Sequence, residues 1–195
     1  MAKTAIHLSG DKDADALLSK DPLALLIGMV LDQQIPLERA FWAPAELARR
    51  MGRPLDAGTI ASMDPEKFAA FFKERPALHR FPGSMAARVQ AVCRIVADEY
   101  GGKTAALWSR QPDGDALVQR LATLPGFGKQ KARIFGALLG KQLGVQPAGW
   151  RAATSPFGAD GSYLSVADIT DAESLAKVRA HKQEMKARAK ARAEA

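Results

Sequence analysis

The chain has 195 residues, of which 47% are hydrophobic, and a formal net charge of +7. This length and apolar content fit one compact domain with a sizeable core and exclude a chain that is disordered throughout. The longest apolar stretch, Pro22–Leu31, is too short to span a bilayer, and the first residues lack the continuous apolar segment of a secretory signal. We therefore expect a cytoplasmic protein without a membrane partner.

Cysteine and histidine are scarce. The single cysteine, Cys93, excludes an internal disulfide, a four-cysteine iron–sulfur cluster and a four-cysteine zinc site within this chain. The three histidines are far apart and show no ligand spacing. We therefore expect no metal and no cofactor.

The first strong helix signal is at Pro22–Leu31. Asp21 is suited to cap this helix, and a proline at the first helical position leaves no N–H unpaired. Because the segment is apolar on every side, it is expected at the centre of the domain. Pro36 ends it, and a second helical region is predicted over Leu37–Met51, kinked or restarted at Pro44.

Two further helices are predicted before the middle of the chain. Asp64 and Pro65 repeat the cap-and-proline signal. Ser84 is predicted to cap the next helix, whose apolar positions recur at helical spacing as far as Tyr100. Cys93 lies in that apolar stripe and is interpreted as a core residue rather than a catalytic thiol.

The segment Asp115–Gly140 predicts two amphipathic helices joined by a tight hairpin. Glycines on both sides of one apolar residue allow backbone conformations that let successive N–H groups point outward together. The second helix then adds unpaired N–H groups and a partial positive charge at the same spot. This arrangement predicts a seat for a nucleic-acid phosphate formed by Leu124, Pro125, Gly126, Phe127, Gly128, Lys129 and Lys131.

After Gly140 the helical pattern gives way to a long stretch punctuated by glycine and proline, which is expected to be irregular and either functional or mobile. Asp171 is predicted to cap a final helix. From Lys177 to Ala195 there are seven basic and two acidic residues, so this tail carries +5 of the net charge. The chain is accordingly divided into a helical domain, residues 1–170, and a basic helix or tail, residues 171–195.

The hairpin resembles that of the helix-hairpin-helix/Gly-Pro-Asp (HhH-GPD) superfamily of base excision DNA repair proteins. A second segment, Leu26–Gln34, is similar to the buried, glutamine-ended helix that this superfamily places beside its base pocket. The resemblance implies an all-α fold of two helical lobes with a cleft between them. It also implies damaged double-stranded DNA as the partner and, for this divergent and cluster-free member, a monomeric DNA glycosylase associated with the nucleoid.

Two positions depart from that family's pattern. Where the family has an aspartate in the loop after the hairpin, this chain has Ala148. That aspartate stabilises positive charge on the sugar as the base leaves, or positions water. Where bifunctional members have a lysine that forms a Schiff base, this chain has Gln130, so lyase activity is not expected.

Several residues are candidates for the missing chemistry. Asp32 is the first choice for the catalytic acid, against a capping or ion-pair role, and Asp168 is the second, while Asp160 is interpreted as a surface turn. Gln33 and Gln34 are assigned to the base pocket, where they would contact a flipped base or fill the gap it leaves; their alternative role is to satisfy the end of the helix.

Aromatic residues offer two more candidates. Trp150 is assigned to stack on the extruded base, or else to cover the core. The loop Leu78–Pro82 has two possible roles: to insert an apolar side chain into the minor groove, or to connect two helices as a packed loop. The resulting prediction is a monofunctional DNA N-glycosylase, a hydrolase of N-glycosyl bonds. The alternatives are a DNA-binding protein that has lost its catalytic acid and a helical protein-interaction domain.

Overall fold

The computed structural model describes residues 5–193, and every regular element in that part of the chain is helical. The only β feature there is an isolated bridge between Asp113 and Ala148. The elements are α1 (Lys12–Lys20), α2 (Pro22–Leu31), α3 (Leu37–Met51), α4 (Ala57–Ser62), α5 (Pro65–Lys73), α6 (Pro82–Tyr100), η1 (Thr104–Leu107), α7 (Gly114–Ala122), α8 (Lys129–Gln142), α9 (Trp150–Ala153), η2 (Val166–Asp168) and α10 (Ala172–Ala193). The all-α expectation is therefore confirmed.

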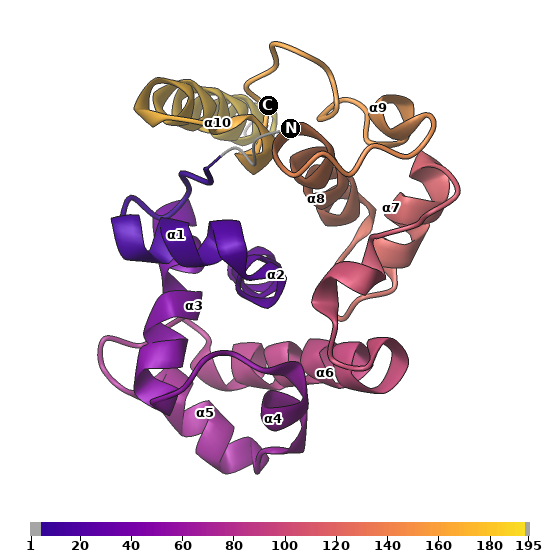
Figure 1. Ribbon diagram of the computed structural model, residues 1–195. Coiled ribbons are helices and arrows are strands. Elements are labelled where there is room, and N and C mark those ends of the chain that lie inside the picture. The colour runs from indigo at the N-terminus through magenta and orange to yellow at the C-terminus, as the bar shows by residue number, and fades with distance from the viewer. Residues whose placement is uncertain (1–4, 194–195) are drawn as a thin grey trace.

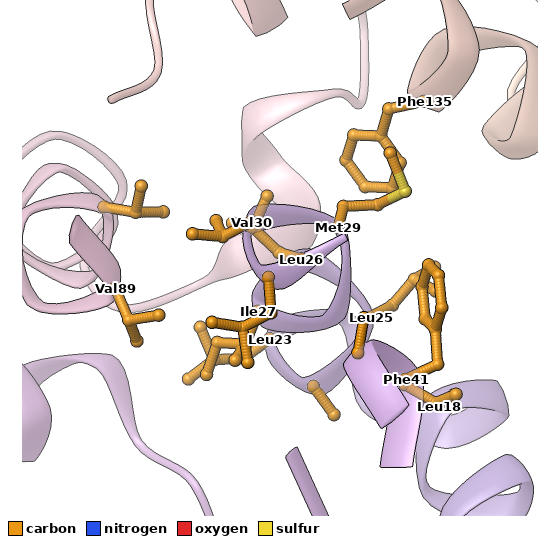
Figure 2. Close-up of a cluster of buried hydrophobic side chains, with 14 of the residues drawn as sticks. Leu18, Leu23, Leu25, Leu26, Ile27, Met29, Val30, Phe41, Val89 and Phe135 are labelled. Atoms are coloured by element: carbon orange, nitrogen blue, oxygen red, sulfur yellow. The ribbon is translucent and has the colours of Figure 1, made fainter. Parts of the chain in front are cut away.

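Helix α2 lies at the centre of the molecule, with the other helices around it (Figure 1). Nine of its ten residues are buried, as its uniformly apolar sequence predicts. Figure 2 shows side chains leaving it on several sides, with Val89 of α6, Phe41 of α3 and Phe135 of α8 among the residues around them. Helices α2 and α3 approach so closely at Gly28 that an added Cβ would lie 2.6 Å from Phe41 Cδ1.

Most of the predicted helix starts are confirmed. The carboxylates of Asp21 and Asp64 accept hydrogen bonds from backbone N–H groups in the first turns of α2 and α5. Asp171 likewise accepts from the backbone N–H of Ser174 at 2.7 Å. The prediction for Ser84 is wrong, because α6 begins two residues earlier, at Pro82, and no side chain caps it. Proline suits the first turn of a helix, so Pro82 rather than the hydroxyl of Ser84 marks this start.

Three other details refine or correct the predictions. Helix α3 runs through Pro44, so of the two predicted alternatives the restart is excluded. Helices α1 and α4, which the sequence pattern did not reveal, begin at the side-chain caps of Asp11 and Asp56. The stretch after Gly140 is not wholly irregular, because it contains the short helices α9 and η2.

The start of α8 reaches the end of α2 through Lys131, whose Nζ donates to Met29 O at 2.8 Å. Helices α7 and α8 pack against each other, and α6 packs against α2, α4 and α5. No helix in residues 5–193 is long and apolar enough to cross a membrane. The final helix, α10, continues as far as Ala193, and residues 194–195 of the predicted tail lie outside the described residues.

Candidate functional site

The hairpin between α7 and α8 turns on Gly126. Its φ of +85° is in the left-handed region that side-chain-bearing residues avoid, and the turn is closed by a hydrogen bond from Phe127 N to Leu124 O at 2.9 Å. Phe127 is buried and packs against Phe135 of α8, with ring centroids 6.0 Å apart. The inward anchor that the sequence predicts is therefore present.

The N-terminal amides of α8 are open. Gly128 caps the helix with extended backbone, φ −85° and ψ 172°, and both hairpin glycines are exposed. Within residues 5–193, the backbone N–H groups of Gly128, Lys129 and Gln130 donate no hydrogen bond. Because α8 is 14 residues long and its dipole adds positive potential here, this end of the helix can bind an anionic oxygen.

The two lysines of the hairpin point in different directions. Lys129 is exposed beside the open amides. Lys131 turns inward, and its Nζ donates hydrogen bonds to Met29 O at 2.8 Å and Val30 O at 3.3 Å. Burial lowers the pKa of Lys131 to about 8. Its ammonium group therefore lies at the end of α2 rather than at the phosphate seat that the sequence predicts for it.

Asp32 follows the last residue of α2 and lines a cavity of about 560 Å³. Burial raises the pKa of Asp32, and the positive charges of Lys182 and Lys131 partly oppose this effect. Most of the cavity wall is apolar and comes from α8, the segment after α9, and α10. Its lining residues are Asp32, Gln130, Ile134, Pro156, Phe157, Leu164, Ser165, Val166, His181, Lys182 and Met185.

The cavity and the hairpin share the first turn of α8. Gln130 lines the cavity while its backbone N–H belongs to the open end of the helix. Asp32 and Gln130 thus line the same cavity, which begins at the open end of α8. His181 and Lys182 were not predicted as cavity residues, since nothing in the sequence indicates that the final helix lines a cavity together with α8.

The two glutamines after α2 have different environments. Gln33 Nε2 donates to Val30 O at 2.8 Å, and Gln33 Oε1 accepts from Arg88 Nη1 at 3.0 Å. Its side chain is therefore engaged within the fold, which is the helix-end role left open by the sequence. Gln34 is exposed and adopts a positive φ of 55°, so its side chain is presented to solvent.

The loop before α6 lies against the same junction. His79 is buried, and its Nδ1 accepts from the backbone N–H of Phe81 at 3.0 Å, so Nε2 carries the proton and donates to Gln33 O at 2.9 Å. Burial lowers the pKa of His79. Phe81 remains 43% exposed, with the guanidinium of Arg80 4.8 Å from its ring centroid. The loop is thus both a connector and the support of an exposed aromatic residue.

Asp168 lies outside the cavity of Asp32, and its carboxylate accepts hydrogen bonds from the loop before α10 and from Lys141. Its Oδ1 accepts from Lys141 Nζ at 2.5 Å and Ser162 Oγ at 2.9 Å. Its Oδ2 accepts from the backbone N–H groups of residues 164 and 165 at 2.9 and 3.1 Å. Both oxygens are committed to holding the loop before α10, and the residue does not line the cavity of Asp32.

Ala148, in the segment directly after α8, lies away from the hairpin. Ala148 O accepts from Gly114 N at 2.8 Å, at the end of α7 that is remote from the hairpin. Trp150 is 6% exposed, and its ring packs so closely on Gly140 that an added Cβ would lie 2.4 Å from it. Trp150 therefore covers the core, which leaves no face for stacking on a base. Asp160 lies in an exposed turn, as predicted, where it pairs with Arg151 at 2.7 Å.

Residues 27–195 match the family described as HhH-GPD superfamily base excision DNA repair protein. The match covers most of the chain and includes the C-terminal half of α2, the hairpin and the residues that line the cavity. The chain belongs to this superfamily, whose members act in base excision repair and bind DNA. Comparison with curated proteins and with solved structures gives no match.

Proposed function

We propose that the protein is a monofunctional DNA N-glycosylase that hydrolyses the bond between a damaged base and its sugar. The observation that carries the proposal is the position of Asp32, which lines a largely apolar cavity together with Gln130 at the open end of the hairpin helix. A cavity of about 560 Å³ has room for an extruded base, and a half-buried carboxyl group in its wall is placed to act on the sugar.

The hairpin would hold the damaged strand. The free backbone N–H groups at the start of α8 bind a phosphate of double-stranded DNA, and Lys129 adds charge beside them. These contacts do not depend on the base sequence. They anchor the strand so that the neighbouring nucleotide can rotate into the cavity, while exposed Gln34 occupies the space that the base leaves.

Asp32 would supply the electrostatic contribution to catalysis. As the C1′–N bond breaks, its electron pair leaves with the base and positive charge develops on the sugar, which the Asp32 carboxylate stabilises. The same carboxylate orients a water molecule, whose oxygen bonds to C1′. Of the two protons of that water, one remains in the new hydroxyl group and the other is transferred to the departing base.

A lyase step is not proposed. It requires a lysine amine on the sugar carbon, and the position that carries this lysine in bifunctional members is Gln130. The neighbouring Lys131 is hydrogen-bonded to the end of α2 and is absent from the cavity wall. The expected product is therefore an intact abasic strand.

The test uses the purified full chain and duplexes that each carry one uracil, alkylated or oxidised base. After incubation, alkali converts abasic sites into strand breaks, and breaks without alkali report lyase activity. We expect alkali-dependent cleavage of at least one duplex, lost in Asp32→Asn and kept in the control Asp98→Asn, which changes an exposed carboxylate of α6. Binding to these duplexes without release of any base would contradict the proposal.

A further inference from the structure

Lys131 is the one residue of the predicted phosphate seat whose charged group is turned into the protein. The last carbonyl groups of a helix have no partner within it. In α2 two of them, Met29 O and Val30 O, accept from Lys131 Nζ at 2.8 and 3.3 Å. Asp32 directly follows this turn, so Lys131 is hydrogen-bonded to the stretch of backbone just before the residue with the carboxyl group.

The other titratable groups around Lys131 and Asp32 come from α3, α6, α10 and the loop before α6. Lys182 of α10, Lys131 of α8 and Glu38 of α3 act on the Asp32 carboxyl group, and His181 of α10 lines the same cavity. Arg88 of α6 repels Lys131, whereas Asp32 attracts it. The positive charge of Lys131 also contributes to lowering the pKa of His79, although burial is the largest cause. Among these groups, Lys131 is the cation that is hydrogen-bonded to the helix end preceding Asp32.

We propose that Lys131 is a positioning residue that holds the Asp32 carboxylate at the wall of the cavity and couples it to the hairpin. The inference rests on the proposed function of Asp32 as the residue that acts on the sugar. Lys131 would touch neither the base nor the sugar. It acts through Asp32, first by fixing the end of α2 and second by favouring the charged form of the carboxyl group.

The placement in α8 gives this coupling a physical route. Lys131 follows Gln130, which lines the cavity, and both residues stand in the helical turn whose free amides form the phosphate seat. A buried ammonium group is costly unless it is paired and hydrogen-bonded. A hydrophobic side chain at this position would avoid that cost, but it would remove one of the two cations that act on Asp32 and both hydrogen bonds from Lys131 Nζ to the end of α2.

The decisive measurement is an NMR titration of the Asp32 side-chain carboxyl carbon. In Lys131→Met we expect the pKa of Asp32 to rise, because one of the two positive charges that lower it has been removed. In Lys131→Arg, which keeps the charge, we expect a smaller change. The control Lys67→Met removes an exposed lysine of α5 and should leave the titration of Asp32 unchanged.

A reciprocal measurement covers the case in which Lys131→Met does not fold. Coupling between two titrating groups must appear from both sides. In the nearly isosteric Asp32→Asn variant, the pKa of Lys131, followed at its Cε carbon, should therefore fall below its value in the unaltered protein. An unchanged Lys131 titration in Asp32→Asn, or an unchanged Asp32 titration in a folded Lys131→Met, would reduce Lys131 to a helix cap and overturn the inference.

These outcomes are distinguishable from those that test the proposed function. If no duplex releases a base, the glycosylase proposal fails, whereas the NMR titrations still report whether the two groups are coupled. If base release is found, Lys131→Met should move the acid limb of its pH profile to higher pH, with little change in KM. If the enzyme releases a base but Lys131→Met does not shift the acid limb, the proposed role of Lys131 fails while the glycosylase proposal stands.

Discussion

Arg88 joins the hairpin to the end of α2. Its Nη1 donates to Gln33 Oε1 at 3.0 Å, and its side chain crosses Gly126 so closely that an added Cβ would lie 2.3 Å from Arg88 Cδ. A single arginine of α6 therefore contacts both segments that carry the resemblance to the repair superfamily. This arginine and Lys131, whose Nζ donates to Met29 O at 2.8 Å, both connect the hairpin region to the end of α2.

The first prediction separates the two hairpin glycines. Gly126→Ala should lower the free energy of unfolding by about 1–3 kcal/mol, because it places a side chain at a φ of +85° and against Arg88. Gly128 has ordinary extended backbone and open space, so Gly128→Ala should leave stability unchanged. Chemical denaturation of both variants measures the difference, and equal losses would contradict this description of the turn.

Gly128→Ala then becomes the cleaner probe of DNA binding. Its new methyl group would stand beside the open amides of α8, where it would hinder the approach of a phosphate. We expect affinity for a duplex containing an abasic-site analogue to fall severalfold at constant salt, with an unaltered melting temperature. If Gly128→Ala binds as tightly as the unaltered protein, the hairpin is not the phosphate seat.

The second prediction concerns the cost of burying Asp32. Because burial raises its pKa above the unfolded value, ionisation of Asp32 destabilises the folded chain. The stability associated with its protonated form is fully present below its unfolded pKa and is lost as the pH rises through the folded pKa. Asp32→Asn should therefore raise the melting temperature by a few degrees at pH 8 and have little effect near pH 3, while abolishing base release.

Thermal melts of the unaltered protein and Asp32→Asn across this pH range provide the check, with Asp98→Asn as the exposed control. An increase in stability combined with a loss of activity is the pattern expected of a functional carboxyl group. A stability loss at every pH would instead assign Asp32 to structure.

Local chemistry in the sequence was enough to predict the hairpin and the central helix. Gly126, buried Phe127 and the capped start of α2 depend on neighbours within a few residues. The directions of Lys129 and Lys131 were not predictable in the same way. They are two positions apart on one helix, and which of them turns inward depends on α2, about a hundred residues earlier in the chain.

The candidate acids illustrate the same limit. Asp32 and Asp168 both follow or belong to a helix end, and a single sequence cannot tell whether such a carboxylate faces a cavity or caps a loop. The structure gives Asp168 four hydrogen bonds and leaves Asp32 beside the cavity. The role of Trp150 was likewise not predictable, because only the close approach of Gly140 in the folded chain shows that the indole ring is packed.

The third prediction concerns a buried charged cluster that positions α3 against α5. Glu46 accepts hydrogen bonds from Arg49 and Arg50, and the pKa of Glu46 is lowered to about 2, with the hydrogen bond from Arg49 as its largest cause. The side chain of Arg50 is 1% exposed and also donates to the carbonyl groups of residues 71, 74 and 76.

Because the folded pKa of Glu46 is depressed, its contribution to stability is fully present above the unfolded pKa of about 4.5 and is lost as the pH falls toward 2. Glu46→Gln should therefore lower the melting temperature at pH 7 and have a progressively smaller effect below pH 4.5. The exposed control Glu99→Gln should show no such dependence. A penalty for Glu46→Gln that stays constant down to pH 2.5 would rule out this ion pair as its cause.

The last prediction concerns the thiol of Cys93, which is fully buried in α6. Burial raises the pKa of this thiol to about 12, and the reactive species is the thiolate, so both access and ionisation oppose its modification. We expect the folded protein not to react with iodoacetamide at pH 8, and the protein unfolded in urea to gain one carbamidomethyl group, as measured by intact mass. Because α6 also carries Arg88, rapid modification under native conditions would mean that this helix opens, and the alignment of the hairpin with the end of α2 would then not be rigid.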